Sequence, residues 1–373
     1  MKFHKLAKSV CAAVLACGML AGCGGGTDAS TETYSGSQEA KIVLNYWTWE
    51  SGIEPGIEAF NKEYPNIEIK ITKVASSGDY LTKIQQSVAS GAELPDILLG
   101  EVGIRGLLFE MNIWEDFESS SLGLDRSLFF ESSVERSCLP DGTLAGMENS
   151  VNPAAMAYKR SVAEKYFDSV EREDMEAAFA TFDDMLAQAA RIHEESGGKD
   201  FLFTSSGMVM DWLYNANADP LVDENGVVQY TAKMKPVLDK LVALRDAEAI
   251  DNYANWTPQN NAAYAGDNHL FYPTANWAIV YLIKANDSEG VGDWGMMLPP
   301  GGGYAHGGTV MGVYNGSKNK EAAFTYLNWM LNTDNGVNTL KEEVAFYVPN
   351  KRYYEDESFT SLEDDFFPVQ DIG

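Results

Sequence analysis

The hydrophobic and polar positions between residues 41 and 100 predict three strands. Residues 41–47 form a short apolar run, KIVLNYW. In residues 67–72, isoleucines alternate with polar side chains, which is the two-residue period of a strand with one buried face. Residues 95–99, PDILL, form a third short apolar run. Each segment therefore predicts a β-strand.

The segments between these strands have the spacing of amphipathic helices. The first helix is predicted from Ile53, Ile57 and Phe60 on one face, with Pro55 in its first turn. A second helix is predicted over 80–91, ending near a glycine. The order βαβαβ predicts a parallel sheet, in which ligands gather at the carboxyl ends of the strands. The loops after Trp47 and Leu99 are the expected site positions.

The rest of the chain is mostly helical by the same criterion, without an internal repeat. Apolar residues three and four apart predict helices over 161–167, 181–195, 232–247 and 320–331. Thr181 followed by two aspartates is typical of a capped helix start.

The first forty residues predict an export signal and a tether. A basic start carrying Lys2, Lys5 and Lys8 precedes an apolar stretch over 10–20, which is too short to span a bilayer. The stretch ends in Leu-Ala-Gly-Cys23, which resembles the bacterial lipobox. We expect cleavage of residues 1–22, diacylation of Cys23 and a flexible tether over 23–40. The alternative is an ordinary secretory signal with a chance cysteine.

Composition and charge narrow the function classes. A chain of 373 residues with 45% hydrophobic residues is large enough for two globular lobes. Its formal net charge is −28, and loss of the three leader lysines makes it more negative still. Such a surface disfavours nucleic acid and basic-patch membrane binding. Only Cys138 would remain as a free thiol, so no internal disulfide can form.

The sequence carries none of the common catalytic signatures. It has four histidines and none has a partner at metal-ligand spacing, so neither a metal nor another cofactor is expected. It lacks a G-x-S-x-G elbow, a Walker A lysine loop and a dinucleotide-binding glycine pattern. We therefore expect a protein that is not an enzyme, with a surface glycosidase as the remaining enzymatic alternative.

Aromatic residues beside polar ones favour a sugar site. Trp49-Glu50, Asp211-Trp212 and Asn276-Trp277 stand at positions predicted as loops. An aromatic face covers the C–H face of a pyranose, and a neighbouring acid or amide bonds its hydroxyls. Any single pair is more simply a core aromatic with a solvated neighbour, but the three together favour a binding site.

An ordered set of motifs resembles the family-one extracellular solute-binding proteins of ABC importers, the group that includes the maltose-binding protein. The motifs span nearly the whole chain after residue 40, in the family's order. They are NYWTW at 45–49, AFNKEYPNI at 59–67, PDI at 95–97, DGTLAG at 141–146, AYK at 157–159, TFDDM at 181–185, WG at 294–295, LP at 298–299 and SKNKEAAF at 317–324.

The resemblance implies an α/β, two-lobed periplasmic-binding-protein-like fold with a central ligand cleft and hinge crossovers. Lobe one would comprise 41–149 plus 311–350, and lobe two 150–310 plus 351–373. A monomer would capture a mono- or oligosaccharide and deliver it to an ABC transporter permease at the cell membrane, anchored only through Cys23. The residues carried over as ligand-binding are Trp47, Trp49, Glu50, Glu101, Glu148, Asn149, Asp211, Trp212, Tyr214, Asn276, Trp277, Gly307 and Gly308.

Two departures from the family pattern bear on these expectations. Asn276 stands where the family usually has glycine before the tryptophan, which leaves open a hydroxyl contact or a turn cap. The final segment, FFPVQDIG, is similar to one that several helical turns usually follow. We therefore expect either a longer natural chain or a lobe two without its terminal helices. The same fold binding a polyamine, peptide or anion is the alternative function.

Overall fold

The computed structural model describes residues 41–119 and 122–371. Contacts divide the chain between Glu39 and Ala40, and all described residues belong to the second compact unit. The predicted leader, the lipidated Cys23 and the tether lie outside the described residues. None of the described helices combines the length and apolar character needed to cross a bilayer.

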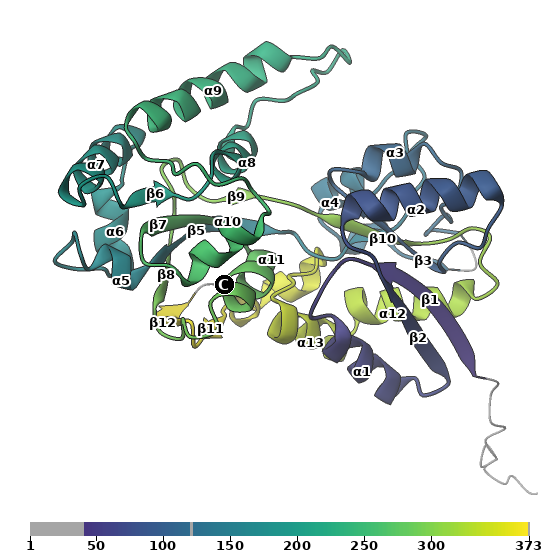
Figure 1. Ribbon diagram of the computed structural model, residues 1–373. Coiled ribbons are helices and arrows are strands. Elements are labelled where there is room, and N and C mark those ends of the chain that lie inside the picture. The colour runs from purple at the N-terminus through teal and green to yellow at the C-terminus, as the bar shows by residue number, and fades with distance from the viewer. Residues whose placement is uncertain (1–40, 120–121, 372–373) are drawn as a thin grey trace, which may run out of the picture. The chain divides into compact units, whose positions relative to one another are not determined.

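The first sheet begins with the predicted parallel unit. Its strand order is β2-β1-β3-β10-β4, with β1 parallel to both β2 and β3 (Figure 1). β10 comes from late in the chain and lies between β3 and β4, antiparallel to both. The strands are β1 (Ile42–Thr48), β2 (Ile67–Lys73), β3 (Ile97–Glu101), β4 (Met147–Glu148) and β10 (Thr309–Val313).

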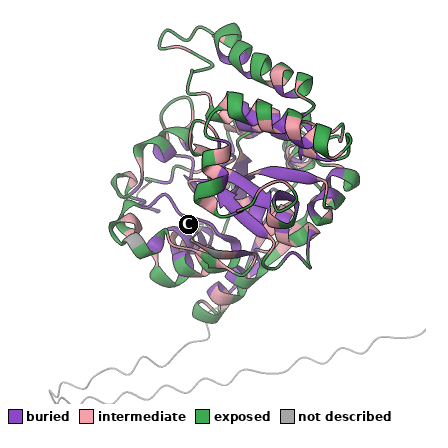
Figure 2. Ribbon diagram, turned by 90° about the vertical axis from the view of Figure 1, so that its left-hand side faces the viewer, coloured by how far each residue is buried: buried purple, intermediate pink, exposed green. Residues whose placement is uncertain are grey.

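Helices from both ends of the described chain share one core with this sheet. Figure 2 shows the strands buried and the surrounding helices turning exposed faces outward. The core joins Leu44 and Ile97 of the strands to Phe60, Ile84 and Trp329 of the helices. The helical segments here are α1 (Glu54–Glu63), α2 (Ser77–Ser90), α3 (Arg105–Phe109), η1 (Arg126–Leu128), α4 (Glu131–Arg136), α12 (Lys320–Asn332), α13 (Asp334–Val344), η4 (Lys351–Glu355) and η5 (Glu357–Phe359).

The second sheet is mainly antiparallel and has its own core. Its order is β6-β7-β5-β8, and β9 pairs with β5. A separate antiparallel pair, β11-β12, contacts β8. The strands are β5 (Pro153–Lys159), β6 (Phe201–Phe203), β7 (His269–Ala275), β8 (Trp294–Met297), β9 (Tyr304–Ala305), β11 (Glu363–Asp364) and β12 (Phe367–Asp371).

Most helices around the second sheet come from the middle of the chain. Met185, Ile192, Trp212 and Leu244 pack with Phe271 of β7 in one buried cluster. The helical segments are α5 (Arg160–Ala163), α6 (Arg172–Ala178), α7 (Phe182–Glu195), α8 (Ser206–Ala216), α9 (Tyr230–Asp246), α10 (Pro258–Ala262), η2 (Ala263–Ala265), α11 (Asn276–Ala278) and the π-helical η3 (Ile279–Lys284).

Two antiparallel crossovers connect the sheets. Residues 149–152 lead from β4 to β5, and residues 306–308 lead from β9 to β10. The backbone N–H of Asn149 donates to the carbonyl of Thr309 at 3.0 Å, and the N–H of His306 donates to the carbonyl of Asn152 at 3.0 Å. Because each crossover bonds the other, they form one narrow two-stranded connection.

The predicted elements are largely confirmed, with three corrections. Thr181 and Asp184 form the reciprocal cap of α7, and Gly91 ends α2 in the left-handed conformation. The helix predicted over 161–167 is wrong in length, since α5 makes one turn only. The segment of Trp212 was predicted as a loop but is helix α8, because Ser205 caps it and its buried side chains keep a helical spacing. Asn276 and Trp277, also predicted to lie in a loop, begin the helical segment α11.

The predicted lobe boundaries stay predictions. Phe359 packs in the core of the first sheet, beyond the residue at which lobe one was expected to end. The strand β12, further along, contacts β8 of the second sheet. The chain after Asn350 therefore contacts both cores in turn.

Candidate functional site

A cavity of about 540 Å³ lies where the ends of β1, β2 and β3 meet the crossovers, α8 and η3. This volume is in the range of small-molecule sites, roughly 300–1,000 Å³. The wall is formed by Trp49, Glu50, Ser51, Ala75, Ser76, Ser77, Glu101, Asn149, Asn152, Asp211, Trp256, Trp277, Tyr281, His306, Gly307, Gly308, Thr309 and Phe346. It therefore draws on strand ends of the first sheet, on helical segments that follow the second sheet's strands, and on both crossovers.

The aromatic part of the wall is a pair of tryptophan rings. Trp256, in the loop before α10, and Trp277, in α11, stack with centroids 6.2 Å apart and planes 18° apart. The Trp256 residue is 60% exposed. Trp277 is held in place because its Nε1–H donates to the carbonyl of His306 at 3.0 Å. A large, exposed, flat apolar surface is thus presented at the cavity.

Glu50 is a buried carboxyl at the end of β1. Its backbone N–H donates to Thr48 Oγ1 at 2.9 Å, and the Tyr46 hydroxyl donates to its Oε2 at 3.3 Å. The residue is only 8% exposed. Burial raises the pKa of Glu50 to about 7, although the bonds from Tyr46 and Asn149 favour the charged form.

This raised pKa predicts a pH-dependent effect of Glu50→Gln. The folded state holds the proton up to about pH 7, whereas the unfolded chain releases it near the ordinary value of 4.5. Stability from this group is therefore full below pH 4.5 and is lost as the pH rises through 7. The variant should match wild type at pH 4 and exceed its free energy of unfolding by up to about 3 kcal/mol at pH 8.

Urea unfolding between pH 4 and pH 8 measures this difference. Glu58→Gln, which changes an exposed glutamate of α1, is the matched control and should show no such trend. A difference between wild type and Glu50→Gln that stays constant with pH would contradict the prediction.

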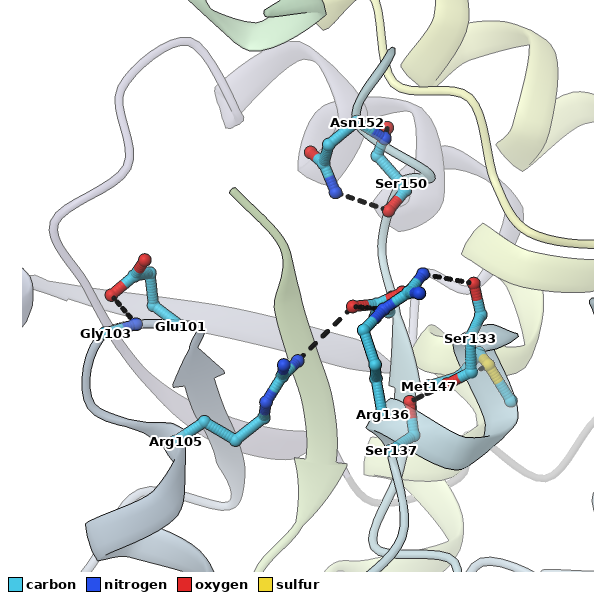
Figure 3. Close-up of polar contacts among 10 residues, drawn as sticks. Glu101, Gly103, Arg105, Ser133, Arg136, Ser137, Met147, Ser150 and Asn152 are labelled. Carbon is cyan, nitrogen blue, oxygen red and sulfur yellow. Dashed lines mark hydrogen bonds and ion pairs between the residues drawn. The ribbon is translucent and has the colours of Figure 1, made fainter. Parts of the chain in front are cut away.

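Two further carboxylates line the cavity, one from a strand of the first sheet and one from a helix of the second core. Glu101 ends β3, and its Oε2 accepts from the backbone N–H of Gly103 at 2.9 Å (Figure 3). Asp211 is on α8, where Asn255 Nδ2 donates to its Oδ2 at 3.4 Å. Burial raises the pKa of both carboxyls. Burial also lowers the pKa of His306, which the charge of Asp211 partly offsets.

The two glycines of the second crossover have a steric role at the wall. Gly307 has φ +100° and Gly308 has φ +123°, which other residues rarely adopt. A Cβ at Gly307 would lie 2.9 Å from Trp277 Nε1, and one at Gly308 would lie 2.8 Å from Glu148 Oε1. Glycine here lets the crossover backbone approach both side chains.

Part of the predicted site lies together at this cavity. The predicted residues on its wall are Trp49, Glu50, Glu101, Asn149, Asp211, Trp277, Gly307 and Gly308. The structure also adds residues that the prediction missed, namely Asn152, Trp256, Tyr281, His306 and Phe346. Of these, Trp256 had a sequence signal as an aromatic residue outside the predicted helices, while the others come from segments with no distinguishing pattern.

Trp47 and Glu148 are predicted residues that do not line the cavity. Trp47 lies two residues before Trp49, which is about 7 Å back along an extended chain. Lys83 Nζ covers its ring at 3.9 Å from the ring centroid. Glu148 is 1% exposed and is bound by two arginines. Arg136 Nη2 donates to its Oε2 at 2.7 Å, and Arg105 Nη1 donates to its Oε1 at 3.3 Å.

Trp212, Tyr214 and Asn276 also lie off the wall. A helix turns about 100° per residue, so Trp212 points into the second core when Asp211 faces the cavity. Tyr214 lies beneath Lys233 of α9, whose Nζ is 4.6 Å from the ring. Asn276 donates to Ser150 Oγ at 2.9 Å and to the carbonyl of Ala345, and lines a second cavity of about 440 Å³.

The described residues contain no group of three or more His, Cys, Asp or Glu side chains arranged to hold a metal ion. Aromatic faces, carboxylates, amides and hydroxyls can together bind a polar molecule that also has an apolar face.

Solved structures share this architecture at low sequence identity. An ABC transporter-associated binding protein from B. animalis subsp. lactis, in complex with β-1,6-galactobiose, has a TM-score of 0.72 and 18% identity, covering 88% of this chain and 83% of its own. The GacH receptor of Streptomyces glaucescens has a TM-score of 0.68 and 19% identity, with coverage of 86% and 83%.

A third neighbour is the galacto-N-biose/lacto-N-biose I-binding protein of Bifidobacterium longum. It has a TM-score of 0.68 and 18% identity, with coverage of 89% and 83%. These likenesses confirm the two-lobed α/β fold class. A comparison with curated proteins gave no match.

The family assignment comes from the sequence itself. Residues 57–365 match the model of the bacterial extracellular solute-binding proteins, which covers most of the chain and agrees with the resemblance in the ordered motifs. The chain therefore belongs to the family of bacterial extracellular solute-binding proteins.

Proposed function

We propose that this protein captures a mono- or oligosaccharide in the cavity and delivers it to an ABC transporter permease. The observation that carries the proposal is the stacked pair of Trp256 and Trp277 on a wall that also presents carboxylates and amides. A pyranose needs both kinds of group, since its C–H face is apolar and its edge is lined with hydroxyls. The neighbours described in complex with galactobiose, lacto-N-biose and acarbose support a saccharide.

The proposed mechanism is binding without chemical conversion. A saccharide would bind to groups from both lobes. The lobes would then close around it by bending at the crossovers. We propose a monomer tethered outside the cytoplasm through a lipid on Cys23, with the closed form recognised by the permease. We also propose that the protein is not an enzyme, because the wall serves recognition and the family binds solutes.

Isothermal titration calorimetry of the purified full-length protein against a carbohydrate panel tests this function. Trp256→Ala should weaken binding of the ligand so identified by about 10-fold or more, because the exposed ring gives up its stacking contact. The fold should be little affected, since the ring is mostly solvent-exposed.

The control is Tyr230→Ala, which removes an exposed aromatic side chain remote from the wall. Equal affinity in wild type and Trp256→Ala would contradict the tryptophan site. Release of smaller sugars from an oligosaccharide during the titration would instead favour the glycosidase alternative.

A further inference from the structure

The side chains of the cavity wall include three carboxylic acids and no strong base. Glu50, Glu101 and Asp211 line it, whereas no lysine or arginine does. Tyr281 and His306 are the other titratable residues of the wall, and burial raises the pKa of the first and lowers the pKa of the second. The charge of Asp211 partly offsets the effect of burial on His306.

The nearest basic side chains of the first sheet are engaged elsewhere. Lys73 Nζ forms an ion pair with Glu54 at 3.0 Å and bonds the backbone carbonyl of Glu50. Arg105 follows Glu101 along the chain and lowers the pKa of that carboxyl by its charge, but its guanidinium donates to Glu148 (Figure 3). The wall itself therefore carries three acidic side chains and no lysine or arginine.

Glu101 and Asp211 are the two carboxylic acids of the wall that are not fully buried. One oxygen of Glu101 accepts from the N–H of Gly103, and Oδ2 of Asp211 accepts from the amide of Asn255 at 3.4 Å. Glu101 is on strand β3 of the first sheet, whereas Asp211 is on helix α8, which packs in the core of the second sheet. Desolvating two carboxylates by lobe closure is costly unless the ligand compensates their charge.

Resting on the sugar-binding function above, we propose that the ligand is an amino sugar, or an oligosaccharide containing one, whose ammonium group binds Glu101 and Asp211. The pyranose ring stacks on Trp256 and Trp277, so the aromatic faces bind the sugar and the acids select the amine. Closure then places the ammonium between acidic groups of the two lobes. A wall that only bonded hydroxyls would not distinguish an ammonium group from a hydroxyl on the same sugar.

Matched probes separate the amine from the sugar. Cellobiose, N,N′-diacetylchitobiose and the β-1,4-linked glucosamine disaccharide differ at carbon 2, which carries a hydroxyl, a neutral amide or an ammonium group. Glucose, N-acetylglucosamine and glucosamine form a second set, and the galactose series forms a third. Calorimetry of the full-length protein at pH 6.5 should give at least about 10-fold tighter binding of the amine in one or more sets.

The salt dependence and two variants assign that preference to the carboxylates. The advantage of the amine should shrink between 20 mM and 500 mM NaCl, and Glu101→Gln and Asp211→Asn should each reduce it. Glu58→Gln, at an exposed position on α1, should leave it unchanged.

The outcomes distinguish this inference from the proposed function. Neutral sugars that bind as tightly as their amino counterparts in every set overturn the inference and leave the sugar function standing. An amine preference that persists in both variants overturns the assignment to Glu101 and Asp211. Binding of spermidine without binding of any saccharide contradicts the sugar function and the inference together, as does binding of no probe.

Discussion

Replacing Trp212 by alanine is expected to lower the free energy of unfolding by about 3–5 kcal/mol. The residue is 1% exposed, and its ring packs 5.9 Å from Phe203, measured between centroids. Removing an indole from a close-packed core loses its contacts and leaves a cavity that the surrounding helices and strands fill only in part. Urea unfolding at 25 °C, followed by tryptophan fluorescence and circular dichroism, measures the change.

Two other variants show that burial causes the effect. Trp212→Phe should cost clearly less than alanine, since it keeps an aromatic ring and removes a buried Nε1–H that has no acceptor among the described residues. Trp256→Ala, which removes an exposed tryptophan, should change stability little. If Trp212→Ala instead abolished ligand binding at unchanged stability, Trp212 would belong to the binding site after all.

Replacing Glu148 by alanine is expected to cost about 3 kcal/mol of folding free energy. The carboxylate is 1% exposed, and two arginines, Arg105 and Arg136, bind it in the first sheet (Figure 3). Its loss leaves Arg105, whose side chain is 13% exposed, without this partner. The effect lies at the lower end of the range for broken buried pairs because Arg136 is 42% exposed and can regain water.

The ion pair of Arg126 and Glu118 gives a matched control in the same chain. Both of its side chains are substantially exposed, at 42% and 33%. Glu118→Ala should therefore cost no more than about 1 kcal/mol. Equal costs for Glu118→Ala and Glu148→Ala in urea unfolding would refute a special contribution from the buried pair.

The fold was predictable where the pattern of residues within a short segment determines its secondary structure. The alternation of residues 67–72 and the spacing of Ile57 and Phe60 are local, and β2 and α1 form as expected. The capped start of α7 is equally local. The antiparallel β10 was not predicted, because its pairing with β3 depends on contacts more than two hundred residues apart.

The candidate site was predictable to the extent that it follows strand ends. Glu50 and Glu101 stand where parallel strands β1 and β3 finish, which is a general position for ligands. Trp212 was misplaced because a tryptophan beside an aspartate suits a core and a sugar site equally well. Only the packing of α8 against the second core decides which neighbour faces the cavity.

The sequence by itself determined the family, the two-lobed α/β class and the acidic character of the molecule, since ordered motifs, hydrophobic periodicity and charge are properties of the chain. The tertiary structure decided which side chains share one cavity. Trp256 and Trp277 stack there, and Asp211 of helix α8 lines the same wall as Glu101 of strand β3. Such groupings depend on crossovers and helix rotation, which follow from long-range packing and are not encoded in any local pattern.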